Sequence, residues 1–143
     1  MKVDIRRTCG ADFPAIQKIL QSAGLVGDWF NCELFMRLLA RNEGFYFVAT
    51  RNRVVLGTIF SSHDGGYFGY IYKLGVLPQY QREGIGSALL QRVINEFKKI
   101  GIDWYFCHVD KDNIASISVL DKYGIAPQTR FFMADNWSYV IKK

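Results

Sequence analysis

The most constraining feature of the sequence is a strand–helix–strand pattern in its second half. Apolar residues recur at helical spacing from Ile85 to Phe97, and polar or charged residues fill the other positions. The segment before this helix, Tyr67–Val76, has the pattern of a strand. Pro78 stops this strand because proline cannot donate a ladder hydrogen bond. After it comes Ile102–Val109, which is apolar at both alternating positions and typical of a strand buried on both faces. This order predicts a right-handed crossover and a parallel pair of strands.

The first half of the sequence predicts an antiparallel meander preceded by two helices. Two β-branched and aromatic runs, 45–49 and 54–60, flank a short polar turn and are typical of a hairpin. Helical spacing predicts one helix capped by Asp12 and a second over 31–41. The fold class is therefore α/β, a mixed sheet covered by helices. The other expected elements are a strand at 3–5, a helix over 113–123, and final strands near 128–134 and 137–141.

The length of the chain and its proportions of hydrophobic and charged residues indicate an ordinary globular protein. It has 143 residues, of which 50% are hydrophobic and 22% charged. We therefore expect a single domain over residues 1–143 without intrinsic disorder. No uncharged apolar run approaches the ~20 residues of a membrane span. The first residues lack the apolar stretch of a secretory signal, so we expect a cytoplasmic protein with no membrane partner.

The net charge and the positions of the cysteine and histidine residues argue against two further classes, nucleic-acid-binding and metal-binding proteins. The net charge of +5 fits either a solvated basic surface or attraction to a polyanion, namely nucleic acid or a phosphorylated small molecule. Because the basic residues are dispersed, we expect no nucleic-acid partner. The cysteines Cys9, Cys32 and Cys107 are far apart, and His63 and His108 lack metal-ligand spacing. We therefore expect no metal site and no disulfide scaffold.

The segment Val76–Ser87 contains the clearest candidate for a binding site. It joins a predicted strand to the amphipathic helix through a turn with Gly84 and Gly86. Free N–H groups and the positive dipole end at a helix start form an anion site, and glycines let a phosphate approach the main chain. The alternative is a tight turn that needs glycine for its dihedral angles. A Rossmann turn is excluded because Leu89 replaces its third Gly or Ala, and a Walker loop because Gly-Lys-Ser/Thr is absent.

Two motifs in this strand–helix context together indicate a family. The first is Val76-Leu77-Pro78 followed by Gln81-Arg82-Glu83-Gly84-Ile85-Gly86, and the second runs from Asn113, at the start of a helix, to Gly124-Ile125. With them the sequence resembles the GNAT superfamily of acyl-CoA-dependent N-acetyltransferases. That family carries Arg/Gln-x-x-Gly-x-Gly/Ala after a Val-x-Pro-like step, and later an Asn that opens a helix ending at Gly-Phe. The order of elements fits from Lys2 to the C-terminus, so the resemblance covers essentially the whole chain.

The resemblance implies acetyl-CoA as the cofactor. Its pyrophosphate would lie on the amides of Arg82–Ser87, and its pantetheine arm would lie where strands 67–76 and 102–109 splay apart at their C-terminal ends. A main-chain amide there would also stabilise the oxyanion of a tetrahedral intermediate. Asn113 would contact the cofactor arm as well as cap its helix. The implied cofactor-binding residues are Leu74, Gly75, Val76, Gln81, Arg82, Glu83, Gly84, Ile85, Gly86, Ser87 and Asn113.

The resemblance also implies a base for the attacking amine and an acid for the leaving thiolate. In the family's ribosomal-protein alanine acetyltransferases the base lies five residues before the motif's Asn, which is His108 here; a core histidine is the alternative. Many members carry a Tyr seven residues after that Asn, where this chain has Leu120. Tyr123 lies one helical turn further and is a candidate acid, unless it packs the helix against the sheet. Otherwise the acid is Tyr72, Tyr80 or water, or the reaction needs none.

The acceptor pocket of the family is built largely by the first two helices and their connection, here residues 24–33. Asp28 and Glu33 would attract an ammonium, and Trp29 and Phe30 would line a slot for its apolar part. A solvated loop with aromatic anchors is the alternative. Further candidates are Tyr72, Asp64, Tyr67 and Tyr70.

We therefore predict an N-acetyltransferase that moves acetyl from acetyl-CoA to a primary amine by direct attack through a tetrahedral intermediate. The acceptor would be a small molecule, an amino acid or a peptide N-terminus. A homodimer is expected by family analogy alone. The competing hypothesis, motivated by Leu120, is a non-catalytic acyl-CoA-binding sensor or interaction module.

Overall fold

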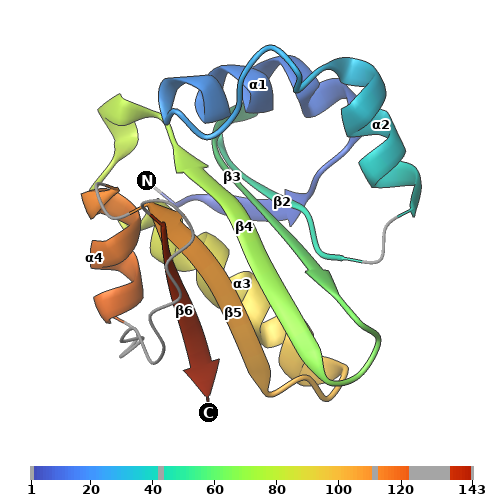
Figure 1. Cartoon of the computed structure of the whole chain (residues 1–143). Helices are drawn as coiled ribbons and strands as arrows, with labels where there is room; N and C mark the ends of the chain where they lie inside the picture. The colour runs from blue at the N-terminus through green and yellow to red at the C-terminus, as the bar shows by residue number, and fades with distance from the viewer. Residues whose placement is uncertain (1, 42–43, 111–112, 123–135, 143) are drawn as a thin grey trace.

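A computed structural model describes residues 2–41, 44–110, 113–122 and 136–142 (Figure 1). It forms a six-stranded sheet whose spatial order follows the chain from β1 to β6. The strands are β1 (Asp4–Arg7), β2 (Phe47–Arg51), β3 (Val54–His63), β4 (Phe68–Val76), β5 (Trp104–Asp110) and β6 (Asn136–Lys142). The α-helices are α1 (Phe13–Ser22), α2 (Cys32–Arg41), α3 (Ile85–Lys99) and α4 (Ile114–Lys122), with short 3-10 helices η1 (Gly10–Asp12) and η2 (Pro78–Tyr80).

The sheet has the mixed topology that the sequence predicts. Neighbouring strands from β1 to β4 are antiparallel, β4 and β5 are parallel, and β5 and β6 are antiparallel. Helix α3 is the crossover between the two parallel strands. The antiparallel meander and the β-α-β unit are thereby confirmed, and β6 confirms the strand expected at 137–141. The strand expected at 128–134 lies outside the described residues.

Helices cover both faces of the sheet, because successive strand residues point to opposite sides. Phe47 packs into a core with the buried face of α3, whereas its neighbour Val48 packs into a second core with α1 and α2. Phe97 of α3 is fully buried in the first core, with ring contacts to Phe45 and Tyr105. The sheet is therefore held between α3 on one side and α1 with α2 on the other.

The start of α1 differs in part from its sequence prediction. Asp12 makes no side-chain capping bond to this helix. Its carboxylate instead accepts hydrogen bonds from the Arg6 guanidinium at 2.7 and 2.8 Å and from the Cys9 amide at 2.9 Å. The hydrogen bonds from Arg6 hold the pKa of Asp12 below its usual value. Asp12 is therefore the N-cap residue of α1, as predicted, but its side chain does not make the capping bond because an arginine from β1 binds it.

Candidate functional site

Strands β4 and β5 separate soon after they begin. Their ladder consists of Phe68 with Trp104, Gly69 with Tyr105 and Tyr70 with Phe106, and the strands diverge beyond it (Figure 1). Over the rest of β4, the side that faces β5 has no strand partner among the described residues. Main-chain polar groups left without a ladder can bind a ligand inserted between strands. The predicted splaying of the central strands is confirmed.

A β-bulge in β4 accompanies the divergence. The register with β3 runs from Tyr72 opposite Phe60 to Gly75 opposite Thr58, so β4 has one extra residue. Lys73 within this step has a positive φ of 54°, which is uncommon for a residue with a side chain. A bulge bends its strand and re-aims neighbouring side chains. Lys73 itself is neither glycine nor proline, and Gly75 at the end of the step did not by itself predict the bulge.

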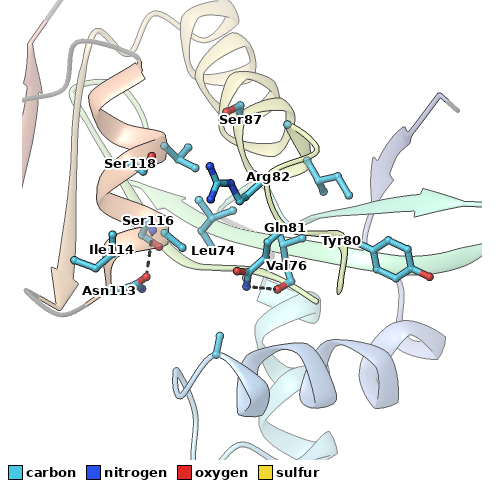
Figure 2. A pocket seen from close by; sticks show the side chains of 17 residues that line it. Leu74, Val76, Tyr80, Gln81, Arg82, Ser87, Asn113, Ile114, Ser116 and Ser118 are labelled. Atoms are coloured by element: carbon cyan, nitrogen blue, oxygen red, sulfur yellow. Dashed lines mark hydrogen bonds between the residues drawn. The ribbon is translucent and has the colours of Figure 1, made fainter. Parts of the chain in front are cut away.

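The open end of β4 lines a cavity of about 420 Å³ (Figure 2). One wall is the end of β4, one is the turn before α3 together with the first turn of α3, and one is the start of α4. All predicted cofactor-binding residues except Glu83 line it. Lining residues that the sequence analysis did not name are Ala23, Ile114, Ala115, Ser116, Ser118 and Val119. Apart from Ala23, these belong to α4, whose weak helical periodicity gave no sign of its cavity-facing side.

Glycine stands at positions 84 and 86, at the start of α3, for two different physical reasons. Gly84 is the N-cap and adopts a left-handed conformation with φ of 81°, so the tight-turn interpretation holds for it. Gly86 lies in regular helix, and a Cβ there would meet only Val119 at 3.5 Å and Val76 at 3.8 Å, which are ordinary contacts. Packing therefore does not require Gly86. Its bare backbone instead leaves room in the cavity at the helix N-terminus, which fits a diphosphate.

Side chains hold the turn and the start of α4 in place. The Gln81 side-chain amide donates to the Val76 carbonyl at 3.1 Å, and the Ser116 amide donates to Asn113 Oδ1 at 3.1 Å (Figure 2). Asn113 thus caps α4 as predicted, and its side-chain NH2 group is a donor available to the cavity. Glu83 points to β2, where it forms a 2.7 Å ion pair with the largely buried Arg51.

A second, smaller cavity of about 60 Å³ lies between the separated parts of β4 and β5, and we call the two cavities together the crevice and this smaller one its inner end. It shares Leu74, Asn113 and Ser116 with the larger cavity, so the two are adjacent. Leu120, at the position of the family's tyrosine, is only 4% exposed and lines it. Cys107 lines it from β5, and burial raises the pKa of this thiol to about 12.

The proposed acid and base are placed only in part. His108 lies two residues after Phe106, the last β5 residue that pairs with β4, and its backbone is in register with Ser138 of β6. It therefore belongs to the open part of the strand. Tyr123 lies outside the described residues. Tyr72 lines the inner cavity, its hydroxyl lies 3.3 Å from that of Tyr46, and burial raises its pKa.

The predicted acceptor residues between α1 and α2 do not form one cluster. Asp28 and Trp29 are exposed in the connection, and Glu33 is exposed in the first turn of α2. Phe30 is only 2% exposed and packs among other phenylalanine rings of the second core. This placement gives Phe30 a packing role instead of the predicted slot. Sequence reasoning missed Lys73, whose ammonium lies 5.4 Å from the Trp29 ring.

Other kinds of site find no support in the part of the chain that the structure covers. No three His, Cys, Asp or Glu side chains among the described residues are grouped so that they could hold a metal ion. In the same residues, every helix is too short or too polar to cross a bilayer.

Comparison with known proteins identifies the family. Residues 13–125 match the acetyltransferase (GNAT) family. Over 104 residues the chain is 30% identical to the mycothiol acetyltransferase of Nocardiopsis dassonvillei, covering 71% of this chain but only 30% of that protein. Over 112 residues it is 29% identical to an acetyltransferase of Pectobacterium atrosepticum, covering 78% of this chain and 79% of that protein.

The fold is also that of solved acetyltransferases. The PaiA N-acetyltransferase of Thermoplasma acidophilum, solved in complex with coenzyme A, superposes with a TM-score of 0.84 at 17% identity and covers 100% of both chains. Family motifs, matched residues and fold thus agree. This chain belongs to the GNAT family of acyl-CoA-dependent N-acetyltransferases, for which acetyl-CoA is the donor.

Proposed function

We propose that this chain transfers the acetyl group of acetyl-CoA to a primary amine by direct attack of the amine on the thioester. The observation that carries the proposal is the crevice itself. The β4–β5 ladder stops after three residue pairs, and the open edge of β4 leads to the glycine-bearing N-terminus of α3. A long, thin donor with a diphosphate at one end and a reactive group at the other matches this shape.

The residues that would hold the donor follow from the cavity lining. The amides from Arg82 to Gly86 would bind the diphosphate, because the first N–H groups of a helix have no partner within that helix. The edge of β4 at Leu74–Val76 would bind the pantetheine arm, with the Asn113 amide as a further donor. When bound, acetyl-CoA supplies a thioester whose carbonyl carbon accepts the nucleophile.

The protein's own part in the reaction is to orient the amine, remove its proton and stabilise charge. Attack by the neutral amine nitrogen forms the C–N bond and places negative charge on the carbonyl oxygen, and an amide of the bulged β4 would stabilise this oxyanion. His108, on the open part of β5, would take the amine proton. The C–S bond then breaks and the thiolate leaves.

The proton for the thiolate is assigned to water. Leu120 cannot donate a proton, and it lines the inner cavity where the family's tyrosine stands. Tyr72 lines the same cavity, but burial raises its pKa, which makes it a weaker acid. We therefore assign the proton to a neutral solvent water at the sulfur, and the proton that His108 takes from the amine returns to solvent to balance it.

The second candidate function is a non-catalytic acyl-CoA sensor. Leu120 favours it, because an apolar side chain stands where relatives carry a proton donor. A sensor and an enzyme would use the same crevice and differ only in turnover.

One experiment separates the two functions. Thiol release from acetyl-CoA is followed colorimetrically against a panel of primary amines, and thermal unfolding is followed with and without acetyl-CoA. At a donor concentration of 100 Kd the folded state should gain about 2.7 kcal/mol, a rise in Tm of roughly 5–10 °C. Amine-dependent thiol release supports the enzyme, and stabilisation without release supports the sensor. A folded chain that acetyl-CoA does not stabilise would contradict both.

A further inference from the structure

Lys73 occupies an unusual position at the bulge of β4. It is half-buried and its backbone has a positive φ of 54°. Its ammonium donates a 2.6 Å hydrogen bond to the Leu25 carbonyl and lies 5.4 Å from the Trp29 ring. A residue held in a sparsely populated backbone conformation costs free energy, and such residues gather at functional sites. The bulge therefore aims this lysine at the connection between α1 and α2.

The charge of Lys73 has no counter-ion among the described residues. The ion pairs found there join other cations to Asp12, Glu83 and Glu96, and none includes Lys73. Its partners, a carbonyl oxygen and an aromatic face, are both neutral. Burial lowers the pKa of Lys73, and no neighbouring charge offsets that effect. A half-buried cation without an anion is costly unless something restores the balance.

Lys73 lies at the acceptor end of the crevice. It lines the inner cavity together with Leu25 of the α1–α2 connection and with Leu74, which also lines the larger cavity. The glycine-bearing end of α3 belongs to the larger cavity alone. A donor that enters at α3 and follows the edge of β4 would thus present its reactive end on the side where Lys73 stands.

We infer that Lys73 selects acceptors in which the amine is accompanied by a carboxylate, as in a free amino acid. This inference rests on the proposed function and names its acceptor class. An ammonium has three N–H donors, and Leu25 uses one, so two remain for a carboxylate. Charge-assisted hydrogen bonds of this kind are strong and directional. The carboxylate would supply the missing counter-ion and fix the amine relative to the thioester.

The test compares amino acids with their carboxamides as acceptors, for the wild type and for variants of Lys73. Each of the common L-amino acids is assayed beside its carboxamide, which keeps the amine and side chain but removes the negative charge. For the wild type, kcat/KM of the preferred amino acid should exceed that of its carboxamide on the order of 10- to 100-fold. Lys73→Met should reduce this ratio to near one mainly by raising KM for the carboxylate, whereas Lys73→Arg should keep part of it.

Two controls show that the effect belongs to this lysine. Lys18→Met removes one positive charge from the exposed side of α1 and should leave the ratio unchanged. Thermal stabilisation by acetyl-CoA should be the same in Lys73→Met and the wild type, which shows that the variant is folded and loads its donor.

Three outcomes would overturn the inference without touching the proposed function. These are a wild type that prefers the carboxamides, a Lys73→Met variant that loses activity equally towards the amino acid and its carboxamide, and a preference that survives the substitution.

If no amine is turned over although acetyl-CoA binds, the proposed function fails instead. Calorimetric titration of the amino acids into the CoA-loaded protein then still decides the role of Lys73, because loss of binding in Lys73→Met supports it and unchanged or absent binding contradicts it.

Discussion

In the first half of β4, Phe68 to Tyr70 pair residue by residue with β5, whereas in the second half Lys73 to Val76 have no partner on that side in the described structure. The paired half packs tightly: a Cβ on Gly69 would lie 2.6 Å from the Phe97 ring. The open half contains a bulge and lines two cavities. One strand is thus tightly packed at one end and lines the proposed binding site at the other. Substitutions in the two halves should therefore affect different measurements.

The largest effect is expected at His108, on the open part of β5. His108→Ala should lower kcat by about 10²–10⁴-fold, the usual contribution of a general base, and should make the residual rate rise more steeply with pH. Acetyl-CoA binding should not change. The measurement is steady-state thiol release between pH 6 and 9 with the best amine of the panel. An unchanged rate would remove His108 as the base and leave the crevice as the donor site.

A smaller effect is expected at Gly86. Gly86→Ala adds one methyl group that only touches Val76 and Val119, and alanine is favoured over glycine in a helix by about 1 kcal/mol. The variant should therefore be as stable as the wild type or more so. Its affinity for acetyl-CoA should fall on the order of 10- to 100-fold, because the methyl group keeps a diphosphate from the helix amides. Calorimetry and urea unfolding measure the two effects separately, and unchanged affinity would place the diphosphate elsewhere.

The same substitution in the paired half should do the opposite. Gly69→Ala places a Cβ within 3.0 Å of three atoms of the Phe97 ring, which is fully buried and held by neighbouring rings. Overpacking of this kind costs about 1–3 kcal/mol of unfolding free energy. Urea unfolding should show that loss, while acetyl-CoA affinity measured below the transition stays near the wild-type value. If Gly69→Ala weakens donor binding and leaves stability intact, the division of β4 into two halves is wrong.

The smallest effect is expected at Cys107, and it tests whether water reaches the inner end of the crevice. Burial raises the pKa of Cys107 to about 12, so above pH 9 its thiol keeps the proton in the folded chain but loses it in the unfolded chain. This contribution to stability is complete below the unfolded pKa and is lost as pH rises towards the folded one. Between pH 9 and 10 the wild type should lose on the order of 1 kcal/mol more than Cys107→Ala. Parallel pH profiles would mean that water reaches the thiol.

Much of the fold could be predicted from the sequence, because local patterns decide it. The periodicity from Ile85 to Phe97 gave α3, and Asn113 gave the start of α4. Interactions between distant residues were not predictable. Asp12 is a good N-cap by residue type, yet Arg6 binds it from a neighbouring strand. Likewise, the bulge at Lys73 depends on the pairing between β3 and β4, which Gly75 at its end does not predict alone.

The two ends of the candidate site were predictable to different degrees. The proposed donor end is formed by main-chain amides, and the glycine motif beside them can be seen in the sequence of this chain. The proposed acceptor end is formed by side chains that the fold brings together. Phe30 was predicted there from its position and its aromatic side chain, but it is a core residue. Lys73, which is distant from that connection in the sequence, was missed.

The short ladder between β4 and β5 has a consequence for the whole sheet. With only three residue pairs between them, β1–β4 and β5–β6 are two half-sheets hinged at one end. A molecule that lay along the open edge would supply hydrogen bonds that none of the described segments of the chain supplies there. Binding of acetyl-CoA should therefore slow hydrogen exchange of main-chain amides in the open parts of both β4 and β5. The bound cofactor would take the place of the missing strand-to-strand hydrogen bonds.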